Sequence, residues 1–329
     1  MKAITYRRYG SPEVLGLGEI PKPKVRPGDV LVRVHAASLN ALDWHMIRGK
    51  PYVARFDMGM RQPKSSIPGV DAAGTVEAVG SEVNELKPGD EVFANKGKAC
   101  AEYVSGPARL FVPKPANLTM EQAAAVPAAG ITALMAIRDH GKVRDGQSVL
   151  IHGAGGGVGT FSVQLAKAFG AKVTAVTRTE NIDLVRSIGA DEVIDYTRED
   201  VTRRARRWDV IIDNGATRPL LAMRRILASG GILVNVGASK GDVVGPLVRG
   251  FVGGPLLSAF RDQQIVTFFA SPKREDLLVL KELIEAGRVK PVVDRVYPLA
   301  ATADAVGYLE TMHARGKIVI TVAGTPGAQ

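Results

Sequence analysis

Residues 149–159 decide the fold of this chain, and they read Val-Leu-Ile-His-Gly-Ala-Gly-Gly-Gly-Val-Gly. An apolar run that enters a glycine-rich turn and then a helical pattern is typical of a dinucleotide-binding βαβ unit. Its first glycine makes the turn, its second admits a pyrophosphate and its third allows close helix packing. Ala154 takes the first place here, and Gly156 and Gly159 take the others. A cofactor phosphate is therefore predicted on the loop formed by Ala154, Gly155, Gly156, Gly157, Val158 and Gly159.

The surrounding sequence extends this unit into a doubly wound α/β sheet over residues 121–291. Continuous apolar runs are typical of parallel strands covered on both faces, and helical segments connect such strands. The predicted strands are 149–151, 173–176, 210–212, 232–236 and 265–269. The predicted helices are 158–169, 180–188, 198–207 and 217–228.

Residues 1–120 have a different pattern, with short valine-rich runs separated by turn signals. Pro27-Gly28-Asp29 and Pro88-Gly89-Asp90 each precede such a run, and residues 73–79 alternate at the period of a strand. This punctuation indicates a compact β-rich domain. The last residues, from about 292 to 329, return to short strands such as 317–321 and are expected to complete that first domain.

Composition excludes several classes of protein. With 329 residues, 46% hydrophobic and 23% charged, the chain has the make-up of a two-domain globular protein rather than a disordered one. It lacks a long apolar run, and MKAITYRRYG is not typical of a secretory signal, so we expect a cytoplasmic location away from membranes. The single cysteine, Cys100, excludes an intrachain disulfide and a cysteine-rich zinc site.

The net charge of +10 leaves two interpretations open. Residues 198–207 hold five arginines without interleaved aromatic residues, which favours a solvated helix face. The alternative is a nucleic-acid surface, and with it a non-enzymatic, NADPH-linked RNA-binding or regulatory protein. Nucleic acid is the less favoured partner.

The end of the second predicted strand indicates which nicotinamide cofactor binds. A site for NAD typically places a carboxylate there, against the ribose 2′-hydroxyl. This chain instead places Thr177 and Arg178 at the tip, and Glu180 lies three residues beyond it. A hydroxyl and a guanidinium suit a 2′-phosphate, so the sequence predicts NADPH.

Taken together, the chain resembles the zinc-independent medium-chain dehydrogenase/reductases of the quinone oxidoreductase (zeta-crystallin-like) group. The resemblance implies a GroES-like β-rich domain followed by a Rossmann domain with a doubly wound parallel sheet. It covers nearly the whole chain and is specific for the family but not for a substrate. The matching segments are 38–44, 67–74, 87–93, 101–104, 125–127, 130–134, 154–159, 189–191 and 193–197.

The resemblance also implies cofactor contacts by position. Thr132 would approach from the helix before the sheet, and Tyr196 would join Thr177 and Arg178 at the adenosine end. The nicotinamide end would contact Asn214, Gly215, Val236, Gly237, Ala238, Phe268, Phe269 and Ala270. Dimerisation through residues 265–269 is expected on the same ground.

Zinc-dependent relatives place a cysteine near Asn40, a histidine near the 69–71 turn and another cysteine near residue 150. This chain lacks that ligand set, so no metal is expected and alcohol oxidation loses its usual Lewis acid. The resemblance therefore implies hydride delivery to a small hydrophobic quinone or enone. An enoyl-thioester reductase is the alternative enzyme.

The proton donor has several candidates. His45 lies five residues after Asn40, where related sequences place tyrosine or lysine, and it could protonate an enolate. The simpler interpretation is a packing histidine. Tyr52 is a second candidate, Asn40 is expected to orient the ribose or the substrate, and His152 is expected to be structural. Residues 239–262, apolar and glycine-broken, indicate either a lid or an interface.

Overall fold

The computed structural model describes residues 1–52, 55–236 and 262–322. The chain divides into two compact units. Unit 1 consists of residues 1–129, 272–286 and 291–329, and unit 2 of residues 130–271 and 287–290. Gly237, Ala238 and nearly all of the 239–262 segment lie outside the described residues. No helix in the described ranges is long and apolar enough to cross a membrane.

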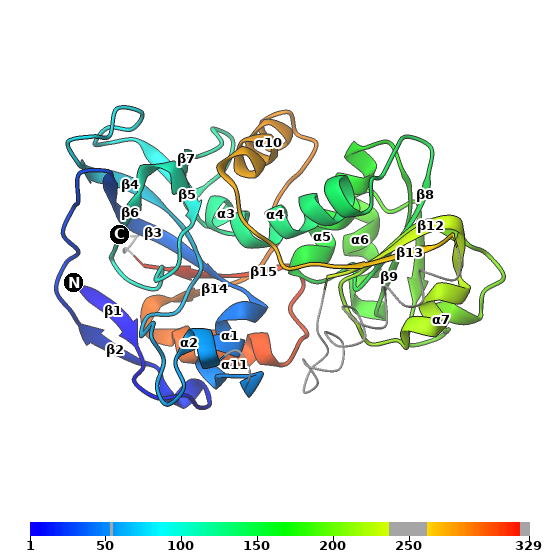
Figure 1. Ribbon diagram of the computed structural model, residues 1–329, viewed down its shortest axis with the longest axis horizontal. Coiled ribbons are helices and arrows are strands. Elements are labelled where there is room, and N and C mark those ends of the chain that lie inside the picture. The colour runs from blue at the N-terminus through cyan, green and yellow to red at the C-terminus, as the bar shows by residue number, and fades with distance from the viewer. Residues whose placement is uncertain (53–54, 237–261, 323–329) are drawn as a thin grey trace. The chain divides into compact units, whose positions relative to one another are not determined.

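Unit 2 is built on one six-stranded parallel sheet (Figure 1). Its strand order is β10-β9-β8-β11-β12-β13, so the order reverses between β8 and β11. In open sheets of this kind, ligands bind beyond the carboxyl ends of the strands at that reversal. The strands are β8 (Ser148–His152), β9 (Lys172–Thr177), β10 (Glu192–Asp195), β11 (Trp208–Asp213), β12 (Leu227–Asn235) and β13 (Gln264–Thr267).

In the described residues, three helices connect these strands: α5 (Gly157–Ala168), α6 (Ile182–Ser187) and α7 (Leu220–Arg225). Helix α4 (Pro127–Leu134) continues into a π-helix, η4 (Met135–His140). Leu150, Ile211 and Leu233, from adjacent strands, form the core with the buried Trp208. Burial of these side chains on both faces explains why the strands are continuous apolar runs in the sequence.

Unit 1 is β-rich, as expected for a GroES-like domain. Its main sheet has the order β14-β15-β3-β4-β5-β7, with β6 also paired to β3. The strands are β3 (Asp29–Leu39), β4 (Asp71–Val79), β5 (Glu91–Asn95), β6 (Tyr103–Pro107), β7 (Phe111–Pro113), β14 (Val293–Pro298) and β15 (Lys317–Thr321). β15, the last strand within the described residues, therefore lies inside the sheet and pairs antiparallel with β3.

A smaller sheet pairs β1 (Lys2–Thr5) with β2 (Gly16–Glu19). The helices of unit 1 are α1 (Ala41–Arg48), α2 (Arg55–Met58), α3 (Met120–Ala124), α10 (Arg274–Glu285) and α11 (Thr302–Glu310). Helix α1 begins directly after the end of β3, so one continuous segment carries the strand, Asn40 and His45. The core contains Val32, Leu39, Val92, Phe111 and Ile320, all essentially inaccessible to solvent.

Two predicted helices were wrong in extent or in kind. The helix predicted over 217–228 is limited to Leu220–Arg225, because β12 already begins at Leu227. The helix predicted over 198–207 is absent, and only the 3-10 turn Val201–Arg203 forms there. The Asp200 carboxylate accepts the Thr202 N–H at 3.0 Å, a local side-chain bond that competes with helix formation.

The arginines of residues 198–207 are also largely engaged by carboxylates of unit 2. Arg204 pairs with Glu199 at 2.6 Å and with Glu192, and Arg206 pairs with Glu192 at 2.6 Å. A run neutralised in this way offers little positive field to a phosphate backbone. The segment is therefore a solvated, ion-paired edge, as its charge pattern favoured, but it is not a helix face.

Candidate functional site

The glycine loop of unit 2 connects β8 to α5, and its glycines differ in how closely other protein atoms approach them. A Cβ on Gly159 would lie 2.1 Å from the Gly153 carbonyl oxygen, so this position requires close packing of the backbone. A Cβ on Gly156 would meet only that same oxygen, at an ordinary 3.7 Å. Gly156 precedes the first residue of α5, whose N-terminal N–H groups are suited to an anion. Because few protein atoms lie near Gly156, a phosphate could approach the N-terminus of α5 closely at this residue.

The end of β9 carries the residues predicted for the adenosine end. Thr177 is buried, and its Oγ1 atom lies 2.9 Å from where a Cβ on Gly155 would be. The Arg178 Nε atom lies 3.3 Å from the Glu180 carboxylate, which is well exposed. Tyr196 is 45% exposed. The structure thus places a hydroxyl beside the glycine loop and a guanidinium next to it in the sequence.

Sequence reasoning missed Asn181 at this end of the sheet. Its side chain is 5% exposed, and its Nδ2 atom lies 2.3 Å from the position of a Cβ on Gly155. Its Oδ1 atom is buried and has no hydrogen-bond partner among the described residues. The signal that could have found it is its position, four residues past the tip of β9.

The sheet reversal carries a second group of polar side chains. The Nδ1 atom of His152, at the end of β8, lies 2.7 Å from the Oδ1 atom of Asp213, at the end of β11. That oxygen also accepts the backbone N–H groups of Gly215 at 3.2 Å and Ala216 at 2.9 Å. Because backbone N–H groups only donate, this geometry assigns the imidazole proton to Nδ1. His152 is buried here, in accord with a structural role.

Asn214 lies within the turn that Asp213 holds. Both its Nδ2 and Oδ1 atoms are buried and have no partner within the described part of the chain. An unpaired buried carboxamide is costly, so this position fits a ligand that supplies both a donor and an acceptor. A nicotinamide carboxamide or a ribose has that chemistry.

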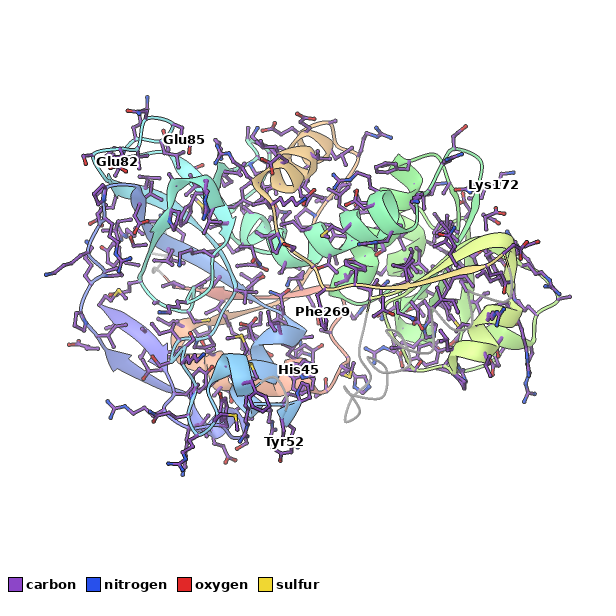
Figure 2. The ribbon with its side chains drawn as sticks, in the orientation of Figure 1. His45, Tyr52, Glu82, Glu85, Lys172 and Phe269 are labelled. Atoms are coloured by element: carbon purple, nitrogen blue, oxygen red, sulfur yellow. The ribbon has the colours of Figure 1, made fainter. Side chains whose placement is uncertain are left out.

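The remaining predicted cofactor residues of unit 2 lie on α4, directly after β12 and directly after β13. Thr132 is half-buried on α4, and Val236 follows β12, where its N–H donates to the Asp213 carbonyl at 3.0 Å. Phe268 stacks on His140 with ring centroids 4.2 Å apart. Phe269 and Ala270 are exposed after β13, and Figure 2 labels the Phe269 side chain.

In unit 1, Asn40 is the centre of a buried polar cluster. The Lys317 Nζ atom donates to the Asn40 Oδ1 atom, and the Asn40 Nδ2 atom donates to the Asp71 carboxylate at 2.8 Å. Asp43 closes the first turn of α1 by accepting the Asn40 N–H at 2.8 Å and the Gly69 N–H at 2.8 Å. Sequence reasoning missed Asp43, Asp71 and Lys317, which lie 1%, 0% and 2% exposed.

Burial dominates the titration of this cluster. It raises the pKa of Asp43 to about 7, and the nearby Asp71 charge adds to the shift, whereas Lys317 opposes it. Burial also raises the pKa of Asp71 and lowers that of Lys317, although their opposite charges act against both shifts. Asp43 borders a cavity of about 190 Å³ that is also lined by Tyr6, Ser65 and Lys96.

The two candidate proton donors differ in environment, and both belong to the α1–α2 part of unit 1 (Figure 2). The His45 ring stacks on Trp44 at 3.6 Å, and its Nδ1 atom is buried without a partner among the described residues. Desolvation lowers the pKa of His45, and a hydrogen bond with the Lys50 backbone opposes that shift. Tyr52 is 67% exposed, with the Arg55 guanidinium 4.9 Å from its ring centroid.

The metal-ligating side chains do not converge. In the described residues no group of three or more histidine, cysteine, aspartate or glutamate side chains is placed to hold a metal ion. Cys100 is fully buried beside Gly69, and burial raises the pKa of its thiol. Asn40 and Val70 occupy the places where zinc-dependent relatives are expected to carry ligands.

Comparison with known proteins identifies the family. Residues 26–137 match the family described as alcohol dehydrogenase GroES-like domain, and residues 188–320 match the family described as zinc-binding dehydrogenase. The quinone oxidoreductase from Coxiella burnetii has a similar structure, with a TM-score of 0.84 and 30% identity over 98% of this chain and 99% of that one.

Two relatives are similar along nearly the whole chain. A chloroplastic NADPH-dependent alkenal/one oxidoreductase of Arabidopsis thaliana is 37% identical, covering 97% of this chain and 79% of the relative. A 2-methylene-furan-3-one reductase of Solanum lycopersicum is 36% identical, also covering 97% and 79%. The chain belongs to the medium-chain dehydrogenase/reductase superfamily, in its quinone oxidoreductase-like family. It is an oxidoreductase related to quinone oxidoreductases and alkenal/one reductases.

Proposed function

We propose that this protein is an NADPH-dependent, zinc-independent reductase of activated alkenes, mainly enones, that also reduces quinones. The observation that carries the proposal is the carboxyl edge of the unit 2 sheet. There a Cβ on Gly156, at the start of α5, would meet only one protein atom and at ordinary contact distance, and Asn214 presents a buried carboxamide without a partner among the described residues. When bound, a reduced nicotinamide cofactor supplies the hydride.

The residues of unit 2 support binding and orientation of that cofactor. The loop from Ala154 to Gly159 would take the pyrophosphate, and Asn214 with Gly215 would take the nicotinamide end. Thr177 and Arg178 would take a 2′-phosphate, because both offer donors where a site for NADH typically has a carboxylate. The exposed Glu180 partly occupies Arg178 and would release it on binding.

The substrate class follows from the family and from the residues of unit 1. Asn40 stands where zinc-dependent relatives are expected to place a cysteine, so the chain's own groups must stabilise the charge that develops on the substrate. Enones and quinones accept hydride without prior polarisation by a metal. The named relatives in Arabidopsis and tomato reduce alkenals, enones and a methylene-furanone, according to their names.

The unit 1 residues then have two tasks in enone reduction. A hydrogen-bond donor must stabilise the oxygen that becomes negative when hydride adds to the β-carbon, and an acid must supply a proton to the α-carbon. Asn40 is proposed to hold the substrate, and His45 is proposed as the acid, with Tyr52 as the alternative donor.

The oligomer is proposed to be a homodimer. Strand β13 lies at the end of the strand order of unit 2, and within the described residues it pairs with β12 alone. An unpaired edge is a ready template for pairing with a second copy. Sedimentation of the intact protein should give the mass of two chains, and a monomer at working concentration would contradict this.

A substrate screen tests the proposed activity. Loss of NADPH absorbance is measured with enones, quinones, aldehydes and enoyl thioesters, each with and without a metal chelator. Turnover of enones and quinones that the chelator leaves unchanged is expected. Turnover of enoyl thioesters alone would favour the alternative enzyme, and activity abolished by the chelator would contradict the zinc-independent assignment.

A further inference from the structure

The Asn40 carboxamide is fixed at both ends by charged, buried side chains. Lys317, at the start of β15, donates to the Asn40 Oδ1 atom and also to the Leu39 carbonyl oxygen at 3.0 Å. Asp71, at the start of β4, accepts from the Asn40 Nδ2 atom at 2.8 Å. Two segments distant in the sequence therefore converge on a single amide.

Chemistry, rather than atom placement alone, fixes which end of the amide faces which partner. A lysine ammonium has donors only, so the atom against it must be the carbonyl oxygen. The Asp71 carboxylate accepts from three further donors: Ser38 Oγ at 3.1 Å, Asn95 Nδ2 at 2.8 Å and Ala128 N at 3.0 Å. A flipped amide would face N–H against ammonium and oxygen against carboxylate, and both contacts would be repulsive.

This arrangement leaves one of the two donor hydrogens of the Asn40 amide available. Its oxygen is taken by the ammonium, and one hydrogen of Nδ2 is taken by Asp71. Among the described residues no other acceptor contacts Nδ2, and Asn40 is only half-buried, unlike Asp71 and Lys317. The second N–H of this half-buried amide therefore has no acceptor within the described part of the chain.

We infer that Lys317 and Asp71 act as positioning residues that hold the Asn40 carboxamide so that its second N–H donates to the carbonyl oxygen of the substrate. The inference rests on the proposed function, because it assigns a donor to the enone oxygen. Hydride from NADPH forms a C–H bond at the β-carbon, and the alkene electron pair shifts so that the carbonyl oxygen becomes negative. The Asn40 N–H stabilises that charge until a proton adds at the α-carbon and restores the carbonyl.

The carbonyl stretching frequency of a bound enone reports this hydrogen bond directly. It is measured by isotope-edited infrared difference spectroscopy in complexes with NADP⁺, in which no hydride is available. In the wild type the donor should lower the frequency. Asn40→Leu removes the donor and Lys317→Met releases the amide, so both should raise the frequency, and both should lower kcat for enones by about 10²–10³-fold.

A matched control separates positioning from general damage to the cluster. Ser38→Ala removes another hydrogen bond to the same Asp71 oxygen without touching Asn40, so it should leave the frequency at the wild-type value. Lys317→Arg retains a donor and should restore the wild-type frequency in part. If Lys317→Met does not fold, Asp71→Asn tests the opposite end of the amide and should also raise the frequency.

The outcomes distinguish the two proposals. A wild-type enzyme that turns over no enone overturns the proposed function. Enone turnover with an unchanged frequency in Asn40→Leu overturns the donor role of Asn40. A raised frequency in Asn40→Leu, with wild-type values in both Lys317→Met and Asp71→Asn, overturns the positioning role of the charged pair.

Discussion

His152 and Asp213 face each other across the reversal point of the unit 2 sheet, with 2.7 Å between imidazole Nδ1 and carboxylate Oδ1. Their strands pair in register at these two residues. The same carboxylate oxygen accepts the Gly215 and Ala216 N–H groups, so it holds the backbone turn that carries Asn214. The pair therefore links the sheet to the turn that is proposed to contact the nicotinamide.

Asp213→Ala should weaken NADPH and NADH binding by the same factor. The substitution removes the acceptor of three hydrogen bonds and frees the Asn214 turn, which is proposed to contact the nicotinamide end that NADPH and NADH share. We expect a loss of at least ~1.4 kcal/mol, or tenfold, from hydrogen-bond energies of this kind. Dissociation constants from cofactor fluorescence would measure it. Asp213→Asn keeps an acceptor oxygen and is the matched control, and a loss confined to one cofactor would contradict the prediction.

Gly156 and Gly159, the second and third positions of the fingerprint, should respond oppositely to alanine. Gly156→Ala adds a methyl group that makes only an ordinary contact with the Gly153 carbonyl oxygen, so the unfolding temperature should stay near that of the wild type while cofactor affinity falls. Gly159→Ala drives a methyl group into the Gly153 carbonyl oxygen and should lower the unfolding temperature instead. Thermal melts and cofactor titrations of both variants provide the comparison. If Gly156→Ala binds the cofactor as tightly as the wild type, the cofactor phosphate does not lie at Gly156.

Arg178→Ala should weaken NADPH and leave NADH nearly unchanged. A charge-assisted hydrogen bond from the guanidinium to a phosphate dianion is worth ~1.5–3 kcal/mol, and NADH lacks that phosphate. Glu180→Gln is the opposing variant, because it removes the carboxylate that pairs with Arg178 and should tighten NADPH. An equal loss for both cofactors in Arg178→Ala would show that this residue does not contact the phosphate.

His45→Ala should slow enone reduction strongly and quinone reduction little. A positioned acid contributes typically 10²–10⁴-fold, and only where the intermediate is too basic to take its proton from water. Because desolvation lowers the pKa of His45, the enone rate of the wild type should fall as pH rises through values below the ordinary 6.5. The variant should lose this dependence.

Two results would change the role of His45. An equal loss with enones and quinones would mean that it positions the site, and no loss would mean that it packs against Trp44. Tyr52→Phe, assayed in parallel, tests the alternative donor.

Asp43 should make the fold less stable as pH rises from about 4 to about 7. Its pKa is higher in the folded chain, about 7, than its ordinary value of 3.8, so the folded state binds the proton more tightly across that interval. Unfolding free energy therefore falls with rising pH in the wild type relative to Asp43→Asn. Urea titrations at several pH values give this difference. Asp90→Asn, at a surface turn, is the control, and a pH-independent difference for Asp43→Asn would contradict the prediction.

The sequence was most informative where local pattern and topology agree. The glycine fingerprint and the apolar runs placed β8, α5, β9 and β11 correctly, because these elements are buried and their apolar patterns are unbroken in the sequence. For β12 the apolar run gave only the second half of the strand. The helix predicted over residues 198–207 was wrong. Arginine has a good helix propensity, but the ion pairs with Glu192 and the hydrogen bond to the Asp200 side chain stabilise a non-helical backbone there.

The polar clusters were harder to predict because their members are distant in the sequence. Asp71 and Lys317 are 246 positions apart, and nothing in the neighbourhood of either residue indicates that they lie near one amide. Asn181 and Asp213 were missed because their importance lies in an unpaired atom and a shared acceptor. Such features become visible only when the packing is known. The site residues predicted from the resemblance stay predictions until the variants are measured.

The position of β15 within the unit 1 sheet has a consequence for synthesis on the ribosome. Asp43 and Asp71 emerge early, but the ammonium of Lys317, which compensates them, follows Asp71 by 246 positions. Until that residue has left the exit tunnel, the nascent first domain has a gap between β3 and β14 and two buried carboxylates without a cation. Formation of the Lys317–Asn40–Asp71 cluster therefore waits for the synthesis of β15, and a chain cut before residue 317 would carry the early segments of unit 1 without a finished sheet.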